Sequence, residues 1–132
     1  MTECDISKII IDDNSPEQII VLKEKGGDRF LPIVIGLTEA SAIKVVFANE
    51  ILPRPITHDL LKLFADVMNA TVKEVFVRDF HAGIFYATIV LTDAQGGEKA
   101  IDARPSDAIA LAVRAHCPIF VKDDLLERTA QE

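Results

Sequence analysis

The sequence predicts an α+β fold, a single domain over residues 1–132 in which a mixed, mostly antiparallel sheet packs against helices. Short apolar segments of strand length, separated by turn-forming residues, make up most of the chain, and short links of this kind join antiparallel strands. Three longer segments instead carry apolar residues at helical spacing. A length of 132 residues with 49% hydrophobic content is sufficient for one ordinary core.

The first half of the chain predicts three strands followed by two helices. Thr38 and Glu39 have the chemistry of a capped helix start, and Thr57 is the expected cap of the next helix. Residues 51–56 between these helices are too proline-rich to be helical. The expected elements are strands at 6–11, 17–23 and 30–35 and helices at 38–49 and 58–69.

The second half predicts two paired strands, a third strand and a largely apolar helix. Residues 108–113 are all apolar, so this helix is expected to be covered on nearly all sides. Pro105 ends the preceding strand, and Ser106 with Asp107 forms the expected helix cap. The expected strands lie at 72–77, 84–91, 99–104 and 119–121, and a last helical turn begins at residue 123 or 124.

The two halves resemble each other, which predicts an internal duplication. The halves cover about residues 6–69 and 72–128, and each would contain three strands, a helix and a further short helix. Three matches occur in the same order in both halves. They pair residues 20–22 with 89–91, residues 38–43 with 106–111, and residues 55–61 with 118–126.

The predicted duplication also separates capping residues from candidates for chemistry. Thr38 and Glu39 occupy the positions of Ser106 and Asp107, so a hydroxyl followed by an acid is interpreted as capping in both halves. Residues 102 and 104 are different, because the first half has Val34 and Gly36 where the second has an aspartate and an arginine. The strand that enters the apolar helix is therefore the first place to look for a site.

The charge balance limits which ligands the chain is expected to bind. Its net charge of −7 comes from 14 basic and 21 acidic residues, and no basic run is present. Nonspecific nucleic-acid binding normally depends on a surface rich in Lys and Arg. With seven Phe, one Tyr and no Trp, a base-stacking platform is not expected either. A site for a polyanion would have to be a local patch.

Cellular context is predicted from cysteine usage and hydropathy. Cys4 and Cys117 have no metal-type spacing and are expected to be free thiols in a reducing cytoplasm. No apolar run approaches the roughly 20 residues of a membrane helix, so no membrane association is expected. The first residues also lack the basic and apolar regions of a secretory signal.

Two segments resemble the signature stretches of the bifunctional nuclease domain family. They are residues 54–61 (RPITHDLL) and 101–111 (IDARPSDAIAL). Residues 31–36 (LPIVIG) and 84–87 (IFYA) resemble its other recurrent segments, and the resemblance extends over about residues 6–128. It implies a nuclease that hydrolyses phosphodiester bonds, with RNA or DNA as the partner, since plant members carry the label of cutting both. The expected nuclease is metal-assisted, with the identity of the metal left open.

The candidate site residues come from these two signature segments. Carboxylates commonly assist phosphodiester hydrolysis by holding Mg²⁺ or Mn²⁺ or by acting as a base, and a histidine can act as general acid or base. A guanidinium group fits phosphate oxygens in bidentate fashion. The candidate catalytic residues are His58, Asp59, Asp102 and Asp107. The candidate substrate-binding residues are Arg54, Thr57, Arg104 and Ser106, and the metal ligands are left open.

The same residues also have purely structural interpretations. Asp102 and Arg104 lie two apart on one strand and could pair with each other, while Asp59 could simply favour the helix dipole. A second hypothesis is therefore a non-catalytic, homo-oligomeric module that binds a partner or an anionic ligand. Convergence of the two segments in one hollow favours the nuclease. Side chains locked in buried mutual ion pairs favour the module.

Overall fold

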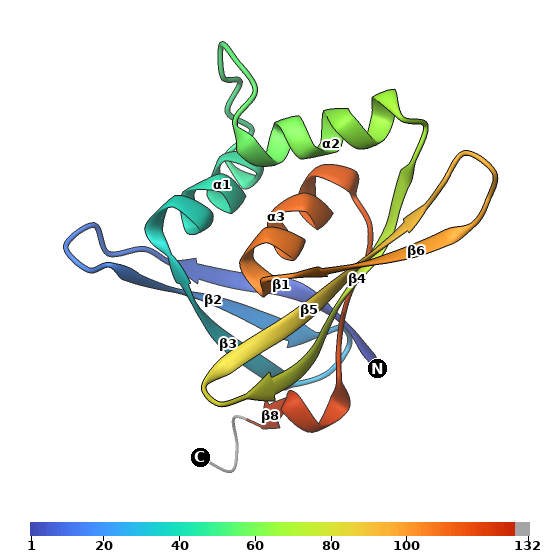
Figure 1. The fold of residues 1–132 in the computed structure, drawn as a ribbon. Coiled ribbons are helices and arrows are strands. Elements are labelled where there is room, and N and C mark those ends of the chain that lie inside the picture. Colours follow the sequence, from blue (N-terminus) through green and yellow to red (C-terminus); the bar gives the residue numbers. More distant parts are fainter. Residues whose placement is uncertain (129–132) are drawn as a thin grey trace.

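Eight strands form one continuous sheet in the computed structural model, which describes residues 1–128 (Figure 1). The strand order is β6-β5-β4-β7-β1-β2-β3-β8. The strands are β1 Thr2–Ile10, β2 Glu17–Glu24, β3 Arg29–Gly36, β4 Thr71–His81, β5 Ile84–Thr92, β6 Glu98–Ala103, β7 Ile119–Val121 and β8 Glu127–Arg128. The helices are α1 Leu37–Phe47, α2 Thr57–Val67 and α3 Pro105–Ala115, with a 3-10 turn, η1, at Asp123–Leu125.

The sheet consists of two antiparallel meanders joined through β7. Strands β1 to β3 form one meander and β4 to β6 the other. Strand β7 lies between them, antiparallel to β1 and parallel to β4, which is the one parallel pair in the described part of the chain. The prediction of an α+β fold with a mixed, mostly antiparallel sheet is confirmed. The short strand β8, which pairs with β3, was not predicted.

Helix α3 lies between the sheet and the other two helices (Figure 1). It contacts α1 and α2 as well as β4 and β5. Its residues 108–112 are all buried, and Ile109 is fully inaccessible to solvent. The prediction that this apolar helix is covered on nearly all sides is thus confirmed. Small alanine side chains at positions 108, 110 and 112 leave room for its neighbours to pack closely.

The predicted hydroxyl caps are wrong at all three helices. The residues that precede the helices are Gly36, Ile56 and Arg104, and none of them makes a side-chain cap. Thr57 is already the first residue of α2, and Ser106 is the buried second residue of α3. In α3 the reason is Pro105, which is suited to the first helical position because the missing N–H would have no partner there.

The internal duplication stays a prediction. A three-strand meander followed by a helix occurs twice, as β1–β3 with α1 and β4–β6 with α3. The third sequence match, however, joins segments of different structure, because residues 55–61 enter helix α2 while residues 118–126 form β7 and η1.

Two further features bear on the cellular context. Among residues 1–128, none of the helices combines the length and the apolar character needed to cross a bilayer. Cys4 and Cys117 are free thiols, and burial raises the pKa of each to about 11. Both are therefore almost entirely protonated at neutral pH.

The central position of α3 predicts the effect of truncating it. Ile109→Ala removes a fully buried side chain and should lower the free energy of unfolding by about 2–5 kcal/mol. Ile84→Ala, at a residue 56% exposed near the β4–β5 turn, should cost about 0.5 kcal/mol or less. Urea unfolding of both variants measures the difference. Equal losses would contradict the placement of α3 in the core.

Candidate functional site

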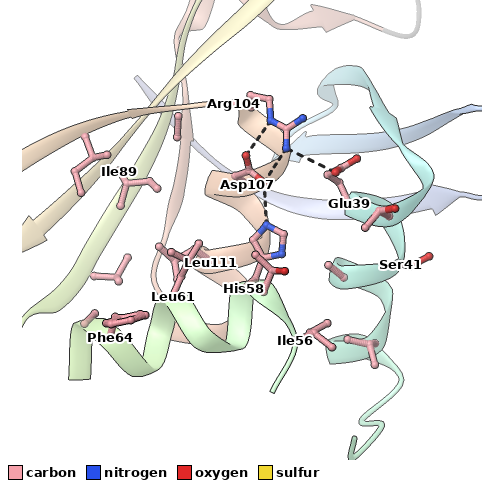
Figure 2. A pocket seen from close by; sticks show the side chains of 18 of the residues that line it. Glu39, Ser41, Ile56, His58, Leu61, Phe64, Ile89, Arg104, Asp107 and Leu111 are labelled. Atoms are coloured by element: carbon pink, nitrogen blue, oxygen red, sulfur yellow. Dashed lines mark hydrogen bonds and ion pairs between the residues drawn. The ribbon is translucent and has the colours of Figure 1, made fainter. Parts of the chain in front are cut away.

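The two signature segments meet through a hydrogen bond between α2 and α3. His58 Nε2 lies 2.9 Å from Asp107 Oδ1, and Arg104 Nε donates to Asp107 Oδ2 at 2.9 Å. Arg104 Nη2 also lies 3.6 Å from Glu39 Oε2 on α1. Figure 2 shows these four side chains in a row, from Glu39 through Arg104 and Asp107 to His58. We call these four residues the polar cluster.

The first turns of all three helices supply the polar cluster. His58 is the second residue of α2, while Glu39 and Asp107 are the third residues of α1 and α3. Arg104 immediately precedes α3. Helix N-termini carry partial positive charge and unpaired N–H groups, which favour carboxylates and other anions. Two of these positions, in α1 and α3, hold an acid, and folding brings the three helix starts together.

The charges of the cluster are fixed by its internal contacts. Burial would raise the pKa of Asp107, but hydrogen bonds from Arg104 and His58 outweigh it and hold that pKa below its usual value. The bond to Asp107 raises the pKa of Arg104. The His58 side chain is only 8% exposed, whereas that of Arg104 is 67% exposed. At neutral pH Asp107 is therefore ionised, and the exposed guanidinium group of Arg104 lies in front of the buried ring of His58.

The polar cluster lies at the edge of a hollow of about 1240 Å³, lined also by residues of α1, α2, β5 and β6. Most of its lining is apolar, as Leu61, Phe64, Ile89 and Leu111 in Figure 2 illustrate. We call this hollow the apolar groove. Arg104 also lines a second hollow of about 870 Å³ and so stands between the two.

Asp59 lies outside the polar cluster, in an ion pair between α2 and α3. Arg114 Nε donates to Asp59 Oδ1 at 2.6 Å, and the N–H of Ile56 donates to Oδ2 at 3.1 Å. Arg114 also donates to the carbonyl oxygens of Ala110 and Ala42, at 2.8 and 2.9 Å. Burial raises the pKa of Asp59, but Arg114 and the Ile56 N–H lower it further than burial raises it. Both carboxylate oxygens thus accept hydrogen bonds, Oδ1 from α3 and Oδ2 from the start of α2 itself, while Arg114 makes the contact to α1.

Arg114 was missed from the sequence. Its side chain is 6% exposed and satisfied by one carboxylate and two carbonyls. The sequence does show a single arginine in the last turn of a largely apolar helix. A cation at that position is already explained by the negative end of the helix dipole, so it gave no reason to expect a buried partner.

Asp102 and Arg104 do not pair with each other. Asp102 Oδ1 lies 2.9 Å from Arg78 Nη2, and Arg78 also donates to Thr88 Oγ1 at 2.6 Å. This contact crosses the neighbouring strands β4, β5 and β6, while Asp102 itself lines the exposed edge of the apolar groove. Arg78, another residue missed from the sequence, lies on β4 and is brought to Asp102 by sheet pairing.

The remaining candidates lie in different places. Thr57 is exposed and lines the apolar groove, whereas Ser106 is buried and lines the second hollow. Arg54 is exposed and lines, with Asp59, a third hollow of about 490 Å³. The structure therefore brings together His58, Arg104 and Asp107 and separates them from Arg54 and Asp59.

The residues present do not fit a resident Mg²⁺ or Mn²⁺ ion in this arrangement. Within residues 1–128, no group of three His, Cys, Asp or Glu side chains is placed to hold a metal ion. Two carboxylates, Glu39 and Asp107, lie in the polar cluster, but the cationic Arg104 is bonded to Asp107 and paired with Glu39. A guanidinium cation between two carboxylates occupies the place that a divalent cation would need.

A family profile and individual known proteins both match most of this chain. The sequence profile described as the bifunctional nuclease domain matches residues 20–132. An uncharacterized protein of Mycobacterium tuberculosis (strain ATCC 25618 / H37Rv) is 35% identical over 126 residues, which cover 96% of this chain and 74% of the relative. Bifunctional nuclease 1 of Oryza sativa subsp. japonica is 32% identical over 112 residues, or 83% of this chain and 34% of the relative. Bifunctional nuclease 1 of Arabidopsis thaliana is 31% identical with the same coverage.

The pair of Asp59 with the buried Arg114 predicts a large effect on stability, because its loss leaves a buried cation without its carboxylate. Asp59→Asn leaves Arg114 without its carboxylate and should lower the free energy of unfolding by about 3 kcal/mol at pH 7. Asp66→Asn on the same helix breaks only the exposed pair with Lys62 and should cost about 0.5 kcal/mol. Urea unfolding of both variants measures the contrast.

The same pair gives the direction of the pH dependence. The folded-state pKa of Asp59 lies below its unfolded value, so its ion pair adds fully to the free energy of unfolding above about pH 4. This stabilisation is lost as the pH falls through the lower, folded-state pKa. The difference between the native protein and Asp59→Asn should therefore shrink in acid. A difference that stays constant down to pH 2 would contradict the assigned ion pair.

Proposed function

Because this chain belongs to the bifunctional nuclease domain family, we propose that it hydrolyses phosphodiester bonds of RNA or DNA at the polar cluster. The observation that carries the proposal is the contact of His58 with Asp107, which joins two segments that are 49 residues apart in sequence. A histidine, a carboxylate and a reachable arginine at the edge of a hollow are the groups that metal-free phosphodiester hydrolysis uses.

Arg104 is the proposed phosphate ligand. It is the member of the polar cluster with the most exposed side chain, and its guanidinium fork suits two phosphate oxygens. The first turns of α1, α2 and α3 add partial positive charge at the same point. Both the Arg104 side chain and the backbone at the helix starts therefore contribute positive charge at this point, on a chain whose net charge is −7.

His58 is the proposed general base, and Asp107 is its positioning residue. A carboxylate can only accept a hydrogen bond, so the bond to Asp107 places the ring proton of His58 on Nε2. The ring makes no other hydrogen bond to the described residues, which leaves Nδ1 to take a proton from water. Water oxygen then bonds to phosphorus, the bond from phosphorus to the leaving oxygen breaks, and that oxygen takes a proton from solvent.

The other predicted site residues have different proposed roles. Thr57 and Asp102 line the apolar groove and stay candidates for contacts with the nucleotide. Asp59 would not contact the substrate but would hold α2 in place, because both of its carboxylate oxygens already accept hydrogen bonds. A cytoplasmic location is part of the same proposal, since the free thiols of Cys4 and Cys117 suit a reducing compartment.

Hydrolysis of single-stranded RNA and DNA by the pure protein tests the proposal. His58→Gln should lower kcat by about 10²–10⁴-fold, the usual contribution of a general base. His81→Gln removes an exposed histidine at the end of β4 and should leave the rate unchanged. The assays are run with Mg²⁺, with Mn²⁺ and with a chelator, and unchanged rates are expected in the chelator.

Four outcomes would overturn the assignment or parts of it. Full activity in His58→Gln would remove the general base, and a strict requirement for Mg²⁺ or Mn²⁺ would replace the metal-free mechanism. Loss of activity in Asp102→Asn but not in His58→Gln would move the site to the edge strand β6. Nucleic-acid binding without hydrolysis under any of these conditions would favour the non-catalytic module.

The small number of reachable cations predicts a weak salt dependence. With Arg104 as the main phosphate ligand, the slope of log affinity against log salt concentration should be of order −1 to −3. Fluorescence anisotropy with a labelled single-stranded oligonucleotide measures this slope in a series of salt concentrations. A slope near −8 would require an extended basic surface and would contradict a local site.

A further inference from the structure

Helix α2 faces the rest of the chain with its polar side. His58 binds Asp107 and Asp59 binds Arg114, so two charged contacts to α3 hold the helix. His58 is also the one residue of α2 that is buried. A surface helix normally directs its apolar stripe at the core and its polar side at solvent. In α2 the arrangement is largely reversed.

The apolar side of α2 is directed at solvent. Six large apolar residues on α2 and at its C-terminal end have between 44% and 76% of their surface exposed, with Val67 the most exposed. One of them, Leu61, is counted with the apolar groove that it lines. We call the other five the apolar crest. They are Leu60, Leu63, Phe64, Val67 and Met68. None of them is charged, so the whole crest is a surface that water solvates poorly.

The area of the crest is that of a protein interface. A fully exposed side chain of this size has an accessible area on the order of 165 Å². With the exposed fractions given above, the five crest side chains together leave roughly 500 Å² in contact with solvent. Ile51, which is 97% exposed, and Leu52 in the preceding loop bring the total to roughly 700 Å². Monomeric proteins rarely expose more than a few hundred Å² in one patch, and a standard interface buries about 800 Å² on each partner.

The surroundings of α2 have a self-complementary shape. The apolar groove, lined by Leu61, Phe64 and Met68, lies on one side of the helix, and the third hollow, lined by Leu63, lies on the other. Leu60 and Val67 line neither of these hollows and stand between them. A ridge beside a groove fits a second copy of itself about a two-fold axis, because each ridge then enters the other copy's groove.

Charge favours a second copy over a nucleic acid as the occupant of this face. Each copy carries a net charge of −7, so two copies approach most easily at an uncharged surface. The charged residues beside the crest, Lys62 and Asp66, neutralise each other at 2.7 Å. Phosphate groups, in contrast, would find no free cation on this face of the helix.

We propose that a second copy of this chain covers the apolar crest, so that the protein is a two-fold dimer with each α2 packed against the α2 of the other copy. Each α2 would also contact the part of the other copy's apolar groove that Leu61, Phe64 and Met68 line, and would leave the polar cluster at the groove's edge open. The interface would bury the crest residues that a single chain leaves in solvent. It does not depend on hydrolysis at the polar cluster, and the experiment below contains no nucleic acid.

Sedimentation velocity of the full chain over a range of concentrations tests the dimer. The native protein should sediment with twice the mass of one chain. Val67→Glu places a charge on the crest and should reduce the mass to that of one chain. Val34→Glu is the matched control, because Val34 on β3 is also an exposed valine, at 59%, and should leave the dimer intact. Circular dichroism verifies that both variants fold.

Hydrogen exchange on the native protein provides a test that needs no variant. Amides of α2 should exchange more slowly as the protein concentration rises. The proposal would be overturned if the native chain is monomeric at all concentrations, or if exchange of the α2 amides does not depend on concentration. The partner that covers the crest would then be a different protein. A Val67→Glu variant that stays dimeric would overturn it as well, and would point to another surface such as the edge strand β6.

Discussion

Two charged contacts between α2 and α3 determine the arrangement on which the rest of the structure depends. His58 with Asp107 lies near the start of both helices, and Asp59 with Arg114 connects the start of α2 to the end of α3. Buried ion pairs add little net stability compared with apolar packing, but breaking one is costly. Their consequence here is geometric, because His58 and Asp59 are neighbours on α2 while their partners lie at opposite ends of α3, so the two contacts set the rotation of α2 at its first turn.

The rotation of α2 connects the candidate site to the apolar crest. The histidine and the aspartate that face α3 occupy the polar side of an amphipathic helix, so the opposite, apolar side must face outward. If α2 were turned to bury that side, Asp107 and Arg114 would each lose a partner. The proposed site and the proposed dimer surface are therefore two results of one orientation.

The sequence predicted what depends on local pattern and missed what depends on tertiary contact. Periodicity and turn chemistry located seven of the eight strands described in residues 1–128 and all three helices, and the apolar run at 108–113 predicted the buried helix. At α3 the expected cap failed because the helix already starts at Pro105, before Ser106. Periodicity also gave the apolar stripe of α2, but it could not tell which side the fold covers. That choice depends on Arg114, whose partner lies 55 residues away.

The same tertiary contacts explain how an acidic chain can carry a site for an anion. At long range a net charge of −7 repels nucleic acid, but this repulsion is screened within about 10 Å at ordinary ionic strength. At the polar cluster the local field is set by Arg104 and by the starts of three helices, while Glu39 and Asp107 balance part of that charge. A phosphate that displaced Glu39 from Arg104 would exchange one anionic partner for another. Binding would then depend on competition between the phosphate and Glu39 for Arg104. The net charge of the chain does not describe that competition.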